Sequence, residues 1–269
     1  MKIKLKLISC LLLTTTLFSI GYASAGELYD EAIIHMPKDG VIRLFGPGGP
    51  HTGYIKVAKA FEAKTGNKVE VIFGPENRWS KDAQRSADII FGSSEQSMTA
   101  YLENYKFVNS NTVEPLFIRP AVIVVKKGNP KHIKGFNDLL KPGMSVIVTE
   151  GKGVYNTSGT GVWEDVAGRL GSLDDVKALR RNIASFEKGS GASFRAFKSL
   201  NADAWITWSH WPIDHADVAE YVELEPERRI YRVTNIAVSP KADPATQDFV
   251  TFLKSDKAAK LFASEGWTK

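Results

Sequence analysis

Residues 150–161 read EGKGVYNTSGTG, and the segments on either side of them decide the fold class of the chain. The run before them, residues 144–148, is apolar and has the length of a buried strand. The run after them, residues 162–170, carries apolar side chains at helical spacing. A strand, a loop of small residues and a helix in succession are typical of an α/β domain.

The loop inside this unit has the chemistry of an anion site. Its threonine and serine hydroxyls can donate hydrogen bonds, and its glycines let backbone N–H groups approach a ligand. The start of the following helix adds partial positive charge. The alternative is an ordinary loop in which a threonine caps the helix. On the first interpretation, the ligand residues of this loop are Asn156, Thr157, Ser158, Gly159 and Thr160.

The same alternation of elements begins earlier in the chain. We expect a helix from His51 up to Gly66, among three strand-like runs at residues 41–45, 68–73 and 87–91. This order predicts a mostly parallel sheet, in which ligand-binding loops gather at the edge where the strands end. Asp88 lies within the third run, where a hydrogen-bonded structural role is favoured over work as a general base.

The second half of the chain repeats the pattern. Strands are expected at residues 116–126, 144–148, 183–186, 203–208 and 229–239. Helices are expected at residues 133–140, 162–170, 192–200 and 245–265, with another from residue 173 to 178 or beyond.

Two such units predict a two-lobed α/β molecule with two mixed sheets flanked by helices. The first lobe would comprise residues 26–118 plus 233–269, and the second lobe residues 119–232. Because the chain would cross between them near residues 117–121 and return near 231–236, the lobes would hinge with the ligand between them. The alternative is two independently packed domains with no moving cleft.

Residues 1–25 have the features of a signal peptide. Three lysines precede an apolar stretch at residues 7–20, and Ala23-Ser24-Ala25 forms a small-residue cleavage site. Residues 7–10 formally resemble a lipoprotein box, but too little apolar sequence precedes Cys10. We therefore expect cleavage near Ala25 and export to the periplasm, with the cell surface or secretion as alternative destinations.

Composition narrows the function classes. The leader holds three lysines and no acid, so its removal lowers the formal net charge from +5 to +2 and leaves no support for nucleic-acid binding. The single cysteine, Cys10, leaves with it, so the mature chain has no disulfide and no thiol chemistry. About 244 residues are enough to build a stable core without such a crosslink.

Four loops that follow strands are rich in small polar groups, at residues 48–52, 92–94, 156–161 and 209–210. Hydroxyls and backbone amides bind oxyanions without burying a second charge. If the two sheets face each other, these loops meet at one cleft. The further candidates that they supply are Gly49, His51, Thr52, Ser93 and Ser94.

Larger side chains near these loops extend the candidate site. Arg78 could pair with an anion in a bidentate way, although it could equally be a solvated arginine paired with Glu76. Arg119 lies beside the proposed crossing and could likewise face the cleft. Trp79 and Trp208 could form the floor of a pocket, although tryptophans in such positions are more often core residues.

Enzymatic and metal-binding functions lack motif support. The loop at residues 156–161 lacks the G-x-S-x-G spacing of a nucleophile elbow, and residues 189–194 lack the third glycine of a dinucleotide loop. His51, His210 and His215 do not have the spacing of a metal site. We therefore predict a binding protein that is not an enzyme and needs no metal or cofactor.

Five blocks of the sequence resemble the accessory colonization factor (AcfC) group, which includes the attaching–effacing-associated adhesin Paa and the PEB-type surface antigens. The blocks are residues 46–52 (GPGGPHT), 73–75 (FGP), 88–92 (DIIFG), 156–165 (NTSGTGVWED) and 202–208 (ADAWITW). The similarity runs in order from about Val41 to Trp267, which is nearly all of the mature chain.

This resemblance implies a type II periplasmic-binding-protein fold of the molybdate- and sulfate-receptor class. It implies capture of an oxyanion or of a phosphorylated or carboxylated metabolite such as a phosphoglycerate, with an ABC-transporter permease as partner. It also implies a link to host colonization and a homodimer. The alternative is an adhesin or virulence factor that contacts host cells through its surface.

The resemblance also bears on single residues. The positions that match the expected ligand contacts are Thr52, Ser94, Thr157, Ser158, Gly159 and Thr160. The Glu76-Asn77-Arg78 triplet departs from the group, in which this loop is less charged. A glutamate here would repel an anion unless Arg78 compensated for it.

Overall fold

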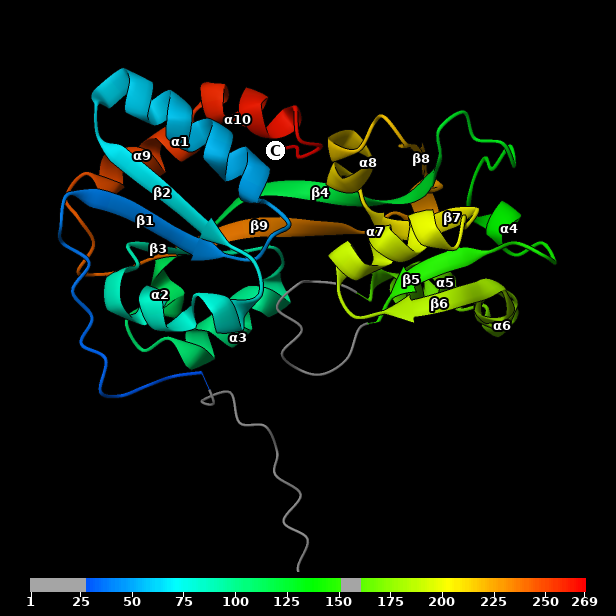
Figure 1. Ribbon diagram of the computed structural model, residues 1–269, viewed down its shortest axis with the longest axis horizontal. Helices are drawn as coiled ribbons and strands as arrows, with labels where there is room; N and C mark the ends of the chain where they lie inside the picture. The colour runs from blue at the N-terminus through cyan, green and yellow to red at the C-terminus, as the bar shows by residue number, and fades with distance from the viewer. Residues whose placement is uncertain (1–27, 151–160) are drawn as a thin grey trace, which may run out of the picture.

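The computed structural model describes residues 28–150 and 161–269. It consists of two α/β lobes that lie side by side, with the strands β4 (Val113–Lys126) and β9 (Tyr231–Val238) running between them (Figure 1). Along the described part of the chain, no helix has both the length and the apolar character needed to cross a bilayer.

The sheet of the first lobe combines parallel and antiparallel strands. Strand β1 (Val41–Gly46) pairs in parallel with β2 (Lys68–Phe73) and with β3 (Ile89–Gly92). Strand β9 then pairs antiparallel with β3, and the first half of β4 pairs antiparallel with β9. The parallel strands bring the loops after β1, β2 and β3 to one edge of the sheet.

Helices cover both faces of this sheet. Successive residues of a strand point to opposite faces, so apolar neighbours in one strand pack against different helices. Leu44 packs on the face covered by α1 (His51–Thr65), α9 (Thr246–Leu253) and α10 (Asp256–Ala263). The next residue, Phe45, packs on the opposite face with α2 (Ser80–Ser86) and α3 (Glu95–Asn104). Figure 1 shows these two helical layers above and below the strands.

The second lobe is built in the same way. Strand β5 (Val146–Thr149) pairs in parallel with β6 (Ile183–Glu187) and β7 (Ala204–Trp208), while β4 pairs antiparallel with β7 and with β8 (Ala219–Glu223). One face is covered by α5 (Val162–Gly168) and α6 (Leu173–Asn182), and the other by α7 (Ser190–Ser199). The short helices α4 (Phe136–Leu139) and α8 (His210–Asp214) complete the lobe.

Strand β4 belongs to both sheets, so the strands form one continuous path. Its first half pairs with β9 as far as Pro120 opposite Tyr231, and its second half, from Ala121, pairs with β7. The two mixed sheets and the two strands that connect them agree with the predicted fold class. The division into residues 26–118 plus 233–269 and residues 119–232 stays a proposal.

The structure differs from the expected elements in several places, among them the short helix α8, which was not expected. The single helix expected at residues 245–265 is two helices, because the hydroxyl of Ser255 accepts a hydrogen bond from the Ala258 backbone and starts α10 anew. Helices α2 and α3 and strand β8 were not expected. Single-turn 3₁₀ segments also occur at η1 (Glu76–Arg78), η2 (Ser110–Thr112) and η3 (Pro226–Arg228).

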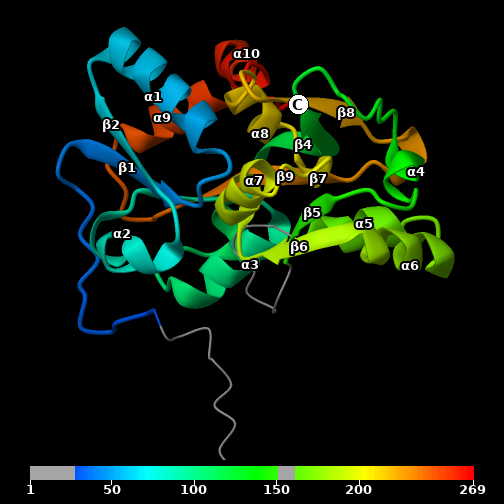
Figure 2. The ribbon, with the colours of Figure 1, turned by 45° about the vertical axis from the view of Figure 1, so that its right-hand side comes forward.

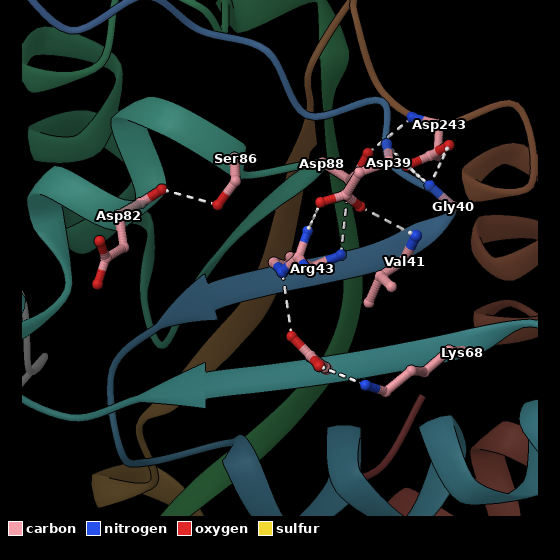
Figure 3. A network of polar contacts seen from close by, with 10 residues as sticks. Asp39, Gly40, Val41, Arg43, Lys68, Asp82, Ser86, Asp88 and Asp243 are labelled. Atoms are coloured by element: carbon pink, nitrogen blue, oxygen red, sulfur yellow. Dashed lines mark hydrogen bonds and ion pairs between the residues drawn. The ribbon is translucent and has the colours of Figure 1, made fainter.

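The structural role expected for Asp88 is confirmed. Its carboxylate accepts hydrogen bonds from the backbone N–H groups of Arg43, at 2.8 Å, and Asp243, at 2.7 Å (Figure 3). Asp243 in turn accepts from the backbone of Asp39 and Gly40. The carboxylates therefore tie β1 to the turn before α9. Burial raises the pKa of Asp88 to about 6.

Candidate functional site

A cleft of about 700 Å³ opens between the two lobes. The loops after β1 and β2 line it on the first lobe, and the start of α7 and the end of β7 line it on the second. Figure 2 shows α7 on the side of the second lobe that faces the first lobe. The side chains that can interact with a ligand there are His51, Glu76, Asn77, Arg78, Arg119, Lys188, Ser190, Arg195, Trp208, His210 and Trp211.

Arg119 lies at the centre of the crossing strand β4 and is 1% exposed. Its guanidinium carbon is 4.9 Å from the ring centre of Trp208 and 4.6 Å from that of Trp267. No ion pair among the described residues includes Arg119, and its Nε atom has no hydrogen-bond partner. Burial lowers the pKa of Arg119 to about 9, so the side chain is still cationic at neutral pH. Buried charges in proteins are normally paired, but the described part of the chain supplies no anion for this cation.

His210 fixes the orientation of Arg119. The Nη1 atom of Arg119 lies 2.8 Å from Nδ1 of His210, and a guanidinium can only donate. The Nδ1 atom of His210 must therefore accept, which places the ring proton on Nε2. The pKa of His210 is held well below its usual value, mainly by burial and to a smaller extent by the charge of Arg119. The ring is therefore neutral.

The loop after β1 approaches Arg119 closely at Gly49. A Cβ atom on this residue would lie 3.0 Å from Nη1 and 3.2 Å from Nη2 of Arg119, so any other residue would push the guanidinium aside by a few tenths of an ångström. His51 supports the same loop: its Nδ1 bonds to the Gly48 carbonyl, and its ring stacks on Phe73 at 3.9 Å. Burial lowers the pKa of His51.

The 3₁₀ segment η1 brings a carboxylate and a guanidinium to the cleft. Arg78 is exposed there, and no ion pair among the described residues joins it to Glu76. Glu76 instead accepts hydrogen bonds at Oε1 from Asn104, at 3.0 Å, and from Tyr105, at 2.9 Å. Arg78 is therefore left available to a ligand.

The second lobe contributes the start of α7. The helix begins at Ser190, which lines the cleft, so the first backbone amides of the helix lie there. The preceding residue has a φ of +90°, a conformation that favours glycine, and it is Gly189. Lys188 and Arg195 add positive charge. The sequence predicts the strand and the helix on either side of this loop, but indicates no ligand role for the loop itself. The available signal was the same order of strand, small residues and helix that marks residues 144–170.

The structure brings some of the residues predicted from sequence to the cleft. Gly49, His51, Arg78 and Trp208 line it. The five loop residues Asn156, Thr157, Ser158, Gly159 and Thr160 lie outside the described residues.

The remaining four predicted residues, Thr52, Trp79, Ser93 and Ser94, are not among the lining residues of this cleft. Thr52 is in the first turn of α1, and its buried hydroxyl oxygen has no hydrogen-bond partner among the described residues. Trp79 belongs to the core of the first lobe, because its Nε1 donates to the Gly74 carbonyl and its ring packs on Tyr101 and Tyr105.

The two serines follow β3 directly and are both buried. Ser93 is fully buried, and its carbonyl oxygen lies 3.5 Å from Nη2 of Arg119. The hydroxyl of Ser94 accepts from the backbone of Ser97 and caps α3. Both serines thus support neighbours of the cleft, and neither is among its lining residues.

Comparison with known proteins places this geometry in a family. Residues 42–268 match the family model described as bacterial extracellular solute-binding protein. One similar solved structure is that of PEB3 bound to L-phospholactate, and PEB3 has also been solved from Campylobacter jejuni. The PEB3 sequence in the L-phospholactate complex is 40% identical to this chain. The match covers 85% of this chain and 99% of PEB3, with a TM-score of 0.79. The sulfate-binding protein SubI from Mycobacterium tuberculosis shares the fold. Its sequence is 21% identical, and the match covers 85% of this chain and 86% of SubI with a TM-score of 0.70.

A curated relative matches over a shorter stretch. The sulfate-binding protein of Salmonella typhimurium is 34% identical over 101 residues, which are 33% of this chain and 30% of that protein. The chain thus spans less than a third of the length of this relative. The family model and the likeness to PEB3 cover most of the chain and confirm the resemblance predicted from the sequence. The chain belongs to the bacterial extracellular solute-binding protein family.

Proposed function

We propose that the protein is a periplasmic receptor, without enzymatic activity, that binds a small anion between its two lobes. The observation that supports this proposal most strongly is Arg119, a fully buried cation at the cleft with no carboxylate partner among the described residues. A ligand anion would supply the missing partner through a charge-assisted hydrogen bond.

The charge of the cleft supports a ligand with more than one negative charge. Its described lining holds four permanent cations, Arg78, Arg119, Lys188 and Arg195, against the single carboxylate Glu76. PEB3 was solved with L-phospholactate, and the curated relative is named for sulfate. We therefore propose an oxyanion or a phosphorylated or carboxylated metabolite, such as a phosphoglycerate, as the ligand.

Three further proposals complete this function. We propose that residues 156–160 contact the ligand, since they follow β5 on the lobe that also supplies α7. We propose an ABC-transporter permease as partner, since the family binds solutes. We also propose a contribution to host colonization and a homodimer, both supported by the resemblance to the colonization-factor group.

A thermal-shift panel tests the ligand proposal. We expect one of sulfate, molybdate, citrate, 3-phosphoglycerate or L-phospholactate, added at micromolar concentrations, to raise the melting temperature by mass action. A melting temperature that none of these anions changes would overturn the proposal. The double change Thr157→Ala and Ser158→Ala should abolish the shift and leave the protein folded, and a retained shift would place the ligand elsewhere.

A further inference from the structure

Glu76 is a carboxylate held in a fixed position at the cleft. Its Oε1 atom accepts from Nδ2 of Asn104 and from the hydroxyl of Tyr105, at 3.0 Å and 2.9 Å. Both donors come from the end of α3, and both are buried, at 7% and 0% exposure. Two buried donors on one oxygen orient the carboxyl group and leave its other oxygen to be satisfied separately.

The second oxygen of Glu76 has no partner among the described residues. No hydrogen bond to Oε2 is formed there, and no lysine or arginine pairs with the side chain, although Arg78 is two residues away. Burial raises the pKa of Glu76, and the bonds from Asn104 and Tyr105 oppose this shift. Because Glu76 lines the cleft, a ligand bound there can donate a hydrogen bond to this oxygen.

This arrangement discriminates between anions by chemistry. Sulfate offers only acceptor oxygens at neutral pH, so beside Glu76 it would meet an acceptor of like charge. An organic anion can place its phosphate or carboxylate at Arg119 and a hydroxyl or ammonium at Glu76. The cleft, at about 700 Å³, has the size of a site for a small organic molecule.

We propose that Glu76 determines specificity by selecting organic anions that carry a hydrogen-bond donor, a hydroxyl or an ammonium, in addition to their phosphate or carboxylate. The inference rests on the proposed anion-binding function and names the class of ligand for that same cleft. It assigns opposite tasks to two side chains: Arg119 pairs with the anionic group, and Glu76 accepts from the donor.

Three phosphate esters that differ at one carbon test this proposal. 3-Phosphonooxypropanoate has a hydrogen at C2, 3-phosphoglycerate has a hydroxyl there, and O-phosphoserine has an ammonium. Calorimetric titration of the wild-type protein should show at least about tenfold tighter binding of one of the two donor-bearing esters than of 3-phosphonooxypropanoate. The ratio between 3-phosphoglycerate and O-phosphoserine identifies which donor the cleft takes.

The variant Glu76→Gln keeps the oxygen that Asn104 and Tyr105 hold and replaces the free oxygen by an NH₂ donor. We expect the preference for the donor-bearing ester to fall to about onefold, while 3-phosphonooxypropanoate and sulfate bind as well as before or more tightly. The control is Glu70→Gln, which makes the same change of charge in β2, where Glu70 pairs with Arg43 and Lys68 away from the cleft. This control should keep the wild-type ratio.

The outcomes separate this inference from the proposed function. Equal affinity of the wild-type protein for all three esters, or a ratio that Glu76→Gln leaves intact, overturns the role of Glu76 and leaves the anion site standing. Tight binding of sulfate with no binding of the esters does the same. If neither the esters nor any inorganic anion binds, the proposed function fails and the inference fails with it.

Discussion

Arg119 carries a charge into the interior of the molecule at a cost in folding free energy. Its bond to His210 and its contacts with Trp208 and Trp267 offset part of that cost, but none of these groups is an anion. The sequence placed Arg119 beside the crossing and left open which way it faced. Burial and the lack of a carboxylate depend on the packing of distant segments, so no local pattern could have shown them.

The residues that sequence analysis did find follow local rules. Gly49 lies in the loop after a predicted strand, His51 begins the helix that follows this loop, and Trp208 ends another strand. Lys188 and Arg195 were not found, because single basic residues near a helix start are common on any surface. Trp79 was proposed as part of the pocket, but its side chain turns inward between α2 and α3.

The approach of Gly49 to Arg119 gives a prediction at the residue scale. Gly49→Ala would place a methyl group 3.0 Å from Nη1 and displace the guanidinium. We expect affinity for the anion that binds best in the thermal-shift panel to fall at least about tenfold in calorimetric titration, with little change in the melting temperature of the ligand-free protein.

The matched control is the preceding residue. A Cβ atom on Gly48 would have nothing within 4 Å, so Gly48→Ala should bind the anion with wild-type affinity. Equal loss of affinity in both variants would show that the loop responds to any methyl group, which would contradict a specific contact with Arg119.

At the scale of elements, the strands were the most predictable feature. Short apolar runs in the sequence correspond to β1, β2 and β7 within one residue at each end. Helices α2 and α3 were missed because polar and small residues interrupt their apolar spacing. The break between α9 and α10 had a signal in the sequence, Ser255 followed by Asp256, which is the composition of a helix start.

The Asp88 carboxylate, which joins β1 to the turn before α9, gives a pH prediction at this scale. Its pKa in the folded protein is about 6, above its ordinary value of 3.8, so between these values the folded state holds the proton more tightly than the unfolded state. The contribution of this group to stability is therefore fully present below about pH 4 and is lost as the pH rises through 6.

Urea unfolding at pH 4.5 and pH 7.5 measures this contribution. We expect Asp88→Asn to lose one of the two backbone N–H bonds that the ionised carboxylate accepts at pH 7.5, because an amide has only one acceptor oxygen. The fall in the free energy of unfolding between the two pH values should also be smaller in the variant. An unchanged pH dependence would show that Asp88 does not titrate in this range.

At the scale of the whole molecule, the order of strands and helices along the chain was enough to predict two lobes and a double crossing. It was not enough to show that β4 belongs to both sheets, because pairing with β9 on one side and β7 on the other is decided by tertiary contacts. This sharing brings Arg119, near the middle of β4, to the junction between the lobes. The architecture thus places the unpaired cation at the cleft.

The central claim is that Arg119 pairs with the ligand anion in the cleft. Calorimetric titration tests this claim most directly. The anion that binds best in the thermal-shift panel is titrated into the wild-type protein, into Arg119→Met and into the control Arg229→Met. Arg229 is a partly exposed arginine that pairs with Glu223 away from the cleft. We predict that Arg119→Met loses on the order of a hundredfold or more in affinity, while its ligand-free form is more stable than the wild type by about 1 kcal/mol because an unpaired buried charge is gone. Arg229→Met should bind like the wild type. Wild-type affinity in Arg119→Met would contradict the assignment of this cleft as the anion site.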